Sequence, residues 1–176
     1  MGQLIFITGG ARSGKSSYAV EQACLIRKRK IFMATCVPGD EEMRLRVEMH
    51  KKTRPSSWRT IEPGSGLETA LKKEVKSSVV ILIDCLTLFI AGLLMKSFSS
   101  NQIIENVQCL LQTIKEGLAT VIVVSNEVGS GLVPETKLGR DFRDIVGVCN
   151  RTAAASADEV YYVVAGIPLK IKGDCK

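Results

Sequence analysis

The sequence has few of the residues that build metal centres or base-stacking surfaces. It contains one histidine, and aromatic residues make up 5% of its 176 residues. The six cysteines are scattered and form no C-x-x-C pair. A structural zinc site needs grouped cysteine and histidine ligands, so this pattern argues against one. We expect reduced thiols in a cytoplasmic protein. No aromatic residue is interleaved with basic ones as a stacking platform for nucleic-acid bases requires.

Long hydrophobic runs are also scarce. The first apolar run is short, so we expect no secretory signal peptide. Residues 79–95 are apolar enough to raise the question of a membrane span, but Asp84 interrupts them and Leu86 onward is typical of a helix start. We therefore expect no span. With 45% hydrophobic residues and no repeat or clear linker, residues 1–176 are predicted to form a single domain.

The charge balance is basic, with 24 Lys and Arg against 18 Asp and Glu and a net charge of +6. An excess of positive charge suits an anionic ligand, either nucleotide phosphates or a nucleic acid. The basic residues are spread out and the chain carries a phosphate-binding motif. Nucleotide binding is therefore the more economical interpretation.

Strand-like and helix-like segments alternate along the chain. Apolar or β-branched runs predict strands at 4–8, 31–35, 58–61, 79–84, 120–125, 159–164 and 169–171, the last two joined by a hairpin across 166–168. Helical patterns lie at 16–29, 41–53, 66–76, 86–96, 101–116 and 135–156. The basic run Arg27–Lys30 would end the first helix, and Ser99 or Ser100 would cap the fifth. The alternation predicts an α/β fold, a mostly parallel twisted sheet with helices on both faces.

Residues 9–16 read GGARSGKS and fit the phosphate-loop pattern G-x-x-x-x-G-K-[ST]. The stretch follows an apolar run and precedes a predicted helix, as the pattern requires. Its glycines let backbone N–H groups converge on one anion, and the helix adds the positive end of its dipole. Lys15 would reach the outer phosphates and the Ser16 hydroxyl would ligate Mg²⁺. We predict a nucleoside triphosphate site formed by Gly9, Gly10, Ala11, Arg12, Ser13, Gly14, Lys15 and Ser16.

Asp84 ends the apolar strand VVILID. In phosphate-loop proteins a carboxylate at this place faces the loop and helps to hold Mg²⁺, directly or through water. The alternative is a carboxylate that caps the following helix. Metal or nucleotide contact is the interpretation we favour.

The single histidine, His50, lies between Arg46 and Arg54 in R-x-x-x-H-x-x-x-R-P. A spacing of four residues would put the three side chains along one helix face. Two guanidinium groups disfavour a further positive charge on the imidazole, and a neutral imidazole is a nucleophile that could attack phosphorus. On spacing alone, an exposed helix histidine among paired charges is the more ordinary interpretation.

Other polar groups are less specific. Ser125–Gly129 follows the fifth predicted strand, at the end of a sheet where ligands bind. Most charged residues of the last helix are expected to pair on its surface, whereas Arg140 and Arg143 could do so or bind phosphate. Glu62, just after a short strand, could accept hydrogen bonds from the N–H groups of a purine.

Six motifs occur in order along nearly the whole chain. They are GGARSGKS at 9–16, R-x-x-x-H-x-x-x-R-P at 46–55, W-R-T-x-E at 58–62, D-C-L-T at 84–87, S-N-E-V-G-x-G-x-V-P at 125–134 and G-R-x-F-R-D at 139–144. Together they resemble the bifunctional adenosylcobinamide kinase / adenosylcobinamide-phosphate guanylyltransferase family of cobalamin biosynthesis. The set is far more specific than a phosphate loop alone.

The resemblance implies two reactions. A nucleoside triphosphate, GTP or ATP, phosphorylates the aminopropanol hydroxyl of adenosylcobinamide; GTP then gives GMP to a histidine, which passes it on to form adenosylcobinamide-GDP. The motifs imply that His50 is the histidine that carries GMP and that Lys15 is the other catalytic residue. Ser16 and Asp84 are implied to bind Mg²⁺, directly or through water. The implied nucleotide contacts outside the loop are Met33, Ala34, Thr35, Lys51, Lys52, Thr53, Arg54, Glu62 and Asp84.

The family further implies a RecA-like phosphate-loop fold and a homotrimer with sites near subunit boundaries. One departure stands out: some relatives carry two adjacent histidines where this chain has Met49 and His50. His50 holds the better-matched position, so we retain it.

Two other functions compete with this interpretation. One is a phosphate-loop small-molecule kinase without a covalent nucleotidyl intermediate. The other is a nucleotide-dependent regulatory or nucleic-acid-binding module, but the sequence lacks an N-K-x-D guanine motif. We therefore expect the partners to be adenosylcobinamide and nucleoside triphosphates, with no nucleic acid.

Overall fold

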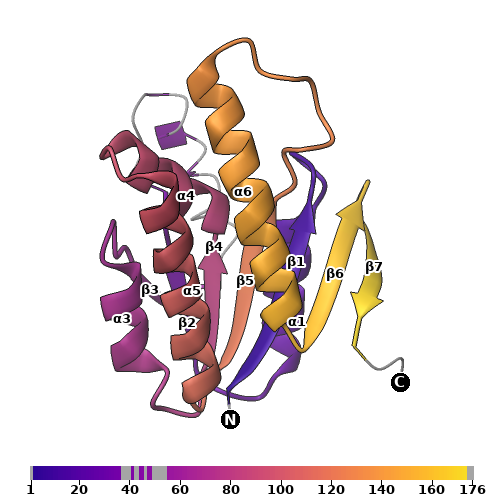
Figure 1. The fold of residues 1–176 in the computed structure, drawn as a ribbon. Helices are drawn as coiled ribbons and strands as arrows, with labels where there is room; N and C mark the ends of the chain where they lie inside the picture. Colours follow the sequence, from indigo (N-terminus) through magenta and orange to yellow (C-terminus); the bar gives the residue numbers. More distant parts are fainter. Residues whose placement is uncertain (1, 37–40, 42–43, 46, 49–54, 174–176) are drawn as a thin grey trace.

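The computed structural model describes residues 2–36, 41, 44–45, 47–48 and 55–173. Within them, seven strands form one sheet in the order β3-β2-β4-β5-β1-β6-β7 (Figure 1). The elements are β1 (Gln3–Gly9), α1 (Lys15–Leu25), β2 (Lys30–Ala34), β3 (Arg59–Ile61), α3 (Leu67–Glu74), β4 (Val80–Asp84), α4 (Leu86–Met95), α5 (Ser100–Glu116), β5 (Thr120–Asn126), α6 (Lys137–Ser156), β6 (Glu159–Val164) and β7 (Ile167–Lys172).

Six of these strands, β1 to β6, run parallel, and β7 pairs antiparallel with β6. The central strands β4 and β5 are buried over nearly their whole length, which explains their continuous apolar sequences. The carboxyl ends of the parallel strands meet at one edge, at the top of Figure 1. Because ligands of open α/β sheets bind at this edge, it positions the candidate site.

Helices cover both faces of the sheet, as predicted. On one face, Ala19 and Ala23 of α1 pack in a cluster with alternate residues of β1, β4 and β5, including Ile7, Leu82 and Val124. On the other face, α3, α5 and α6 bury apolar side chains against the intervening residues of the same strands. Figure 1 shows α5 and α6 in front of the sheet and α1 behind it. The small residues of α1 let that helix lie close to the sheet, next to the loop that precedes it.

The predicted boundaries agree with most of the observed ones, and the differences have local causes. α1 ends at Leu25, so the basic run Arg27–Lys30 does not close the helix; its last residue opens β2 instead. The hairpin turns at Ala165 and Gly166, with φ of 48° and 83°. Pro168 already belongs to β7, where an edge strand tolerates a residue without an N–H. Of the predicted helix at 41–53, residues 41, 44, 45, 47 and 48 are helical and the others lie outside the described residues.

The start of α5 confirms one of the two predicted caps. Ser99 is the N-cap residue, and its side chain accepts from the Gln102 N–H while the Gln102 side chain accepts from the Ser99 N–H. No helix in the described part of the chain is both long and apolar enough to cross a membrane.

This cap gives a direct test of the fold. Replacing Ser99 by Ala leaves the first turn of α5 without its acceptor, so the free energy of unfolding should fall by about 1 kcal/mol. Urea unfolding followed by circular dichroism measures the loss. The neighbouring Ser100→Ala variant is the control, because Ser100 is the first helical residue and not the cap. Equal losses from the two variants would contradict the assignment.

Candidate functional site

A glycine-rich loop joins β1 to α1 at the carboxyl edge of the sheet. β1 ends at Gly9 and α1 begins at Lys15, as the GGARSGKS stretch predicts. Gly14 is the N-cap and adopts φ 92°, a left-handed conformation that strains residues with a Cβ. A glycine cap offers no side chain to the first N–H groups of α1, and no acidic residue lies in the helix's described first turn. The positive end of the helix is thus available to an anionic ligand.

Lys15 supplies a buried positive charge beside this loop. Its residue is 8% exposed, and its Nζ donates to the Gly10 carbonyl oxygen at 3.0 Å. The side chain therefore folds back over the loop that it follows. An ammonium group held in this way is placed to contact phosphate oxygens bound by the loop N–H groups.

Neighbouring strands hold the loop in shape. The Glu127 N–H donates to the Gly9 carbonyl at 2.9 Å, and the Gly166 N–H of the β6–β7 turn donates to the Ser13 carbonyl at 2.8 Å. A Cβ added at Gly14 would lie 3.2 Å from the Gly166 Cα, so the turn and the loop are in close contact. The loop conformation consequently depends on both strands that flank β1.

Asp84 lies at the same edge, at the end of β4 and one strand beyond β5. Burial and, next, the negative charge of Asp84 raise the pKa of the adjacent Cys85 thiol to about 12, even though the positive charge of Lys15 lowers it. Asp84 pairs with Val124 of β5, and Gly9 at the start of the phosphate loop pairs with Asn126 of the same strand, so Asp84 and the loop lie at the same end of the sheet on either side of β5. This places the predicted carboxylate near the phosphate loop, although the two belong to strands that are not neighbours.

Thr35 shapes the junction between β4 and α4. Its hydroxyl donates to the Cys85 carbonyl at 2.6 Å and accepts from the Cys85 N–H at 2.7 Å. Thr35 is 3% exposed, and the side chains of Met33 and Ala34 are buried in the two core clusters. Nucleotide contacts at these three residues would therefore have to be made by main-chain groups. The contacts stay predictions.

Glu62 follows β3 and is exposed at the same carboxyl edge. Three strands, β2, β4 and β5, separate β3 from β1. Four strand spacings amount to roughly 19 Å. A nucleotide with its phosphates in the loop would have to run along the edge to place its base at Glu62.

Five predicted site residues lie outside the described residues. They are His50, Lys51, Lys52, Thr53 and Arg54. Their roles stay predictions, as does the helical spacing of His50 with Arg46 and Arg54.

A buried polar cluster joins α4, β5 and α6 beside the loop. Ser125, fully buried, contacts the hydroxyl of Thr87 and the side chain of Asn150. Sequence reasoning noted Ser125 and Asn126 at the end of a strand but assigned most polar residues of the last helix to its surface. Asn150 is an exception, and its place four residues after Val146 on the buried face of α6 was the available signal.

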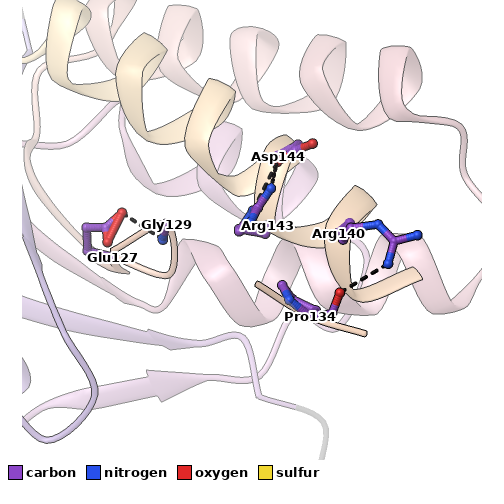
Figure 2. Close-up of polar contacts among 6 residues, drawn as sticks. All are labelled: Glu127, Gly129, Pro134, Arg140, Arg143 and Asp144. Carbon is purple, nitrogen blue, oxygen red and sulfur yellow. Dashed lines mark hydrogen bonds and ion pairs between the residues drawn. The ribbon is translucent and has the colours of Figure 1, made fainter. Parts of the chain in front are cut away.

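The segment between β5 and α6 rises above the carboxyl edge, and its backbone is held by side chains of Glu127 and of α6 (Figure 2). The Glu127 carboxylate accepts from the N–H groups of Gly129 and Ser130 at 2.8 and 3.0 Å. The Arg140 guanidinium donates to the Pro134 and Glu135 carbonyls at 3.1 and 2.6 Å, and Arg143 pairs with Asp144 at 3.1 Å. Arg143 therefore forms an ion pair, as the surface interpretation expects. Arg140 stabilises the segment by donating to two of its carbonyl groups.

The oxygen groups at this edge fit Mg²⁺. Ser16 lies in the first turn of α1 and Asp84 lies near Lys15, so a hydroxyl and a carboxylate flank the phosphate position. No group of three or more His, Cys, Asp or Glu residues among those described could hold a metal ion alone. Mg²⁺ is commonly held by one or two protein oxygens together with nucleotide phosphates, so this donor set is suitable.

A family model described as cobinamide kinase / cobinamide phosphate guanyltransferase matches residues 5–171. The chain belongs to this family. The curated relatives include the bifunctional adenosylcobalamin biosynthesis protein CobU of Salmonella typhimurium (39% identical) and of Escherichia coli (37%), each covering 96% of this chain and 99% of the relative. The protein CobP of Pseudomonas aeruginosa is 36% identical, with 96% of both chains covered. The family resemblance predicted from six motifs is confirmed.

Solved structures of other proteins share the fold of this chain. The RadB recombinase gives a TM-score of 0.51 at 15% identity, covering 91% of this chain and 73% of that one. The type III secretion ATPase EscN of enteropathogenic E. coli gives 0.58 at 13% identity, covering 93% and 43%. These likenesses confirm the predicted RecA-like phosphate-loop fold and carry no conclusion about substrates.

The Glu127 turn predicts a dependence of stability on pH. Burial raises the carboxyl pKa, but the N–H groups of Ser130 and Gly129 outweigh it and hold the pKa below the ordinary 4.5. A lowered folded-state pKa stabilises the protein above pH 4.5, and this stabilisation is lost as the pH falls through the lower folded value. Glu127→Gln should therefore lower the urea midpoint at pH 7, and the difference from the native chain should shrink in acid.

The control for this experiment is Glu135→Gln. The Glu135 side chain is exposed and makes no hydrogen bond among the described residues, although its carbonyl accepts from Arg140. Its urea midpoint should match that of the native chain at both pH values. A Glu127→Gln difference that grows in acid would contradict the role given to the carboxylate.

Proposed function

We propose that this chain phosphorylates the aminopropanol hydroxyl of adenosylcobinamide with a nucleoside triphosphate and then transfers GMP from GTP to the new phosphate. The observation that carries the proposal is the convergence of the loop, Lys15 and Asp84 at one edge, in a chain that matches the family along residues 5–171. The relatives named as bifunctional adenosylcobalamin biosynthesis proteins match along 96% of this chain.

In the kinase reaction, the loop N–H groups and Lys15 bind the β- and γ-phosphates and stabilise the charge of the transferring group. Ser16 and Asp84 would hold Mg²⁺, which when bound neutralises charge on the same phosphate oxygens. The substrate hydroxyl attacks the γ-phosphorus in line with the departing nucleoside diphosphate. The reaction needs no protein nucleophile.

In the guanylyl transfer, His50 is the proposed nucleophile. Its imidazole attacks the α-phosphorus of GTP and pyrophosphate leaves with the electrons of the broken P–O bond. The phosphate of phosphorylated cobinamide then attacks the same phosphorus and releases the imidazole. Lys51, Lys52, Thr53 and Arg54 would contact the nucleotide, and Glu62 would accept from N–H groups of the guanine. The support for these roles is the motif order along the sequence.

The assembly and setting follow the same resemblance. We propose a homotrimer with sites near subunit boundaries, acting in the cytoplasm on adenosylcobinamide and nucleoside triphosphates, with no nucleic-acid partner. The competing kinase without a covalent step would transfer the γ-phosphate but take no GMP.

Two labels separate the steps. With α-labelled GTP, the native chain should acquire an acid-labile label, and with γ-labelled nucleotide it should phosphorylate adenosylcobinamide. His50→Asn should lose the protein label and lower guanylyl transfer by about 10³-fold or more, because the nucleophile is gone, while keeping most kinase activity. Lys15→Ala should lose both activities, since both reactions use the loop. Acid-labile labelling of the His50→Asn variant would exclude the assignment.

A further inference from the structure

The residue at the tip of β5, Asn126, has both of its main-chain groups held by side chains from two helices. Its N–H donates to the Thr87 hydroxyl oxygen of α4 at 2.7 Å. Its carbonyl accepts from the Asn150 Nδ2 of α6 at 3.0 Å. A residue at the end of a strand ordinarily has such groups free for water, so this arrangement holds the Asn126 backbone in place.

The same side chains complete a closed hydrogen-bonded ring. The Thr87 oxygen accepts from Asn126, so its own proton is free to go to the Ser125 hydroxyl oxygen, 2.9 Å away. The Ser125 hydroxyl in turn donates to Asn150 Oδ1 at 2.7 Å. Ser125 is 0% exposed and Thr87 is 3% exposed. Buried polar groups with all of their partners form rigid networks, and the ring therefore fixes Asn126 relative to α4 and α6.

Register places Asn126 beside the phosphate loop. Asn126 pairs with Gly9, the last residue of β1, and β5 separates β1 from β4, which ends at Asp84. Strand side chains alternate between faces. Ile122 and Val124 of β5, and Val80 and Leu82 of β4, face the cluster that contains α1. Asn126 and Asp84 continue those series, so both side chains lie on the face of the sheet where α1 begins with Lys15.

The carboxamide of Asn126 is available to a ligand. It is partly exposed, and it makes no hydrogen bond among the described residues. The carboxylate of the next residue, Glu127, already has hydrogen-bond partners. It accepts from two backbone N–H groups, and those bonds keep its pKa low. At the tip of β5, the uncommitted polar group is thus an amide, which offers hydrogen bonds without changing charge.

We propose that the Asn126 carboxamide is a further catalytic group of the phosphoryl transfer, donating from Nδ2 to an oxygen of the γ-phosphate. This inference rests on the proposed kinase reaction. A bond forms between the acceptor oxygen and the γ-phosphorus as the bond to the β,γ-bridging oxygen breaks. The nucleoside diphosphate leaves with that electron pair, and the acceptor proton passes to solvent. Asn126 exchanges no proton; its donor stabilises charge on the transferring group between Lys15 and Asp84.

Steady-state kinetics with the full chain, Mg²⁺, cobinamide and γ-labelled nucleotide at varied concentration test this role. Asn126→Ala should lower kcat for cobinamide phosphorylation by about 10²–10³-fold, the usual loss for one such donor, with KM for the nucleotide changed by less than about threefold. Asn106→Ala is the matched control, because Asn106 donates to Gln102 of its own helix α5 on the exposed surface. The control should keep the native kcat and KM.

A variant of Asn150 tests whether this residue acts by positioning Asn126. Asn150→Asp keeps an acceptor for Ser125 but removes the donor to the Asn126 carbonyl, so it should lower kcat less than Asn126→Ala and leave KM unchanged. A positioning role predicts that the double variant loses no more than Asn126→Ala alone, whereas independent effects would multiply. Multiplying losses, or a native kcat in Asn126→Ala, would overturn the proposal. So would a loss confined to KM.

Slow hydrolysis of the nucleotide, measured without cobinamide, tests the role of Asn126 independently of which acceptor the chain phosphorylates. The hydrolysis needs no cobinamide, and the same order of variants is expected in it. If the native chain hydrolyses the nucleotide but does not phosphorylate cobinamide, the proposed function fails while the Asn126 comparison still decides its role. If cobinamide is phosphorylated equally fast by native and Asn126→Ala chains, the role of Asn126 fails and the proposed function stands.

Discussion

The buried ammonium of Lys15, held against the Gly10 carbonyl at the carboxyl edge of a parallel sheet, is the charge around which this site is arranged. It lies at the start of a helix whose cap is a glycine, so helix dipole, loop N–H groups and ammonium all favour an anion in one place. Asp84 ends β4 at the same edge, where a carboxylate beside bound phosphates would suit a divalent cation. The parallel arrangement of the strands is what brings these groups together, because every strand of this kind ends at the same edge.

Precision at this edge comes from contacts that are themselves buried or internally satisfied. The loop is bonded to the end of β5 and to the β6–β7 turn, and the tip of β5 is bonded to two helices. The Thr87 and Ser125 hydroxyls that take part at the tip of β5 are buried, in a medium of low dielectric where an unpaired polar group is costly and the paired geometry is well defined. The long segment above the edge follows the same rule on the surface, where Glu127 and Arg140 use its own backbone groups as partners.

The fold by itself would not have indicated the chemistry. Its structural neighbours include a recombinase and a secretion ATPase at 13 to 15% identity, and the likeness to them is one of fold. A phosphate-loop frame supports many reactions, since it supplies phosphate binding and leaves the acceptor to other residues. The ordered motifs outside the loop are what separate this family from its neighbours. Among the described residues, those at 58–62 and 84–87 lie at the ends of β3 and β4, the one at 125–134 lies at the end of β5 and in the segment that follows, and the one at 139–144 lies in α6.

Much of this protein was determined by the sequence itself. The alternation of apolar runs and helical patterns predicted the sheet and its helices. Local chemistry predicted the loop and narrowed the α5 cap to Ser99 or Ser100, because these features depend on residues close together in the chain. The end of α1 at Leu25 was not predicted, since the basic run that follows is compatible with either a helix end or a connection. Only the tertiary structure decided that β5 lies between β1 and β4, and that Thr87, Ser125 and Asn150 meet around Asn126. Strand order and contacts between residues dozens of positions apart depend on how whole faces pack, and no local pattern records that.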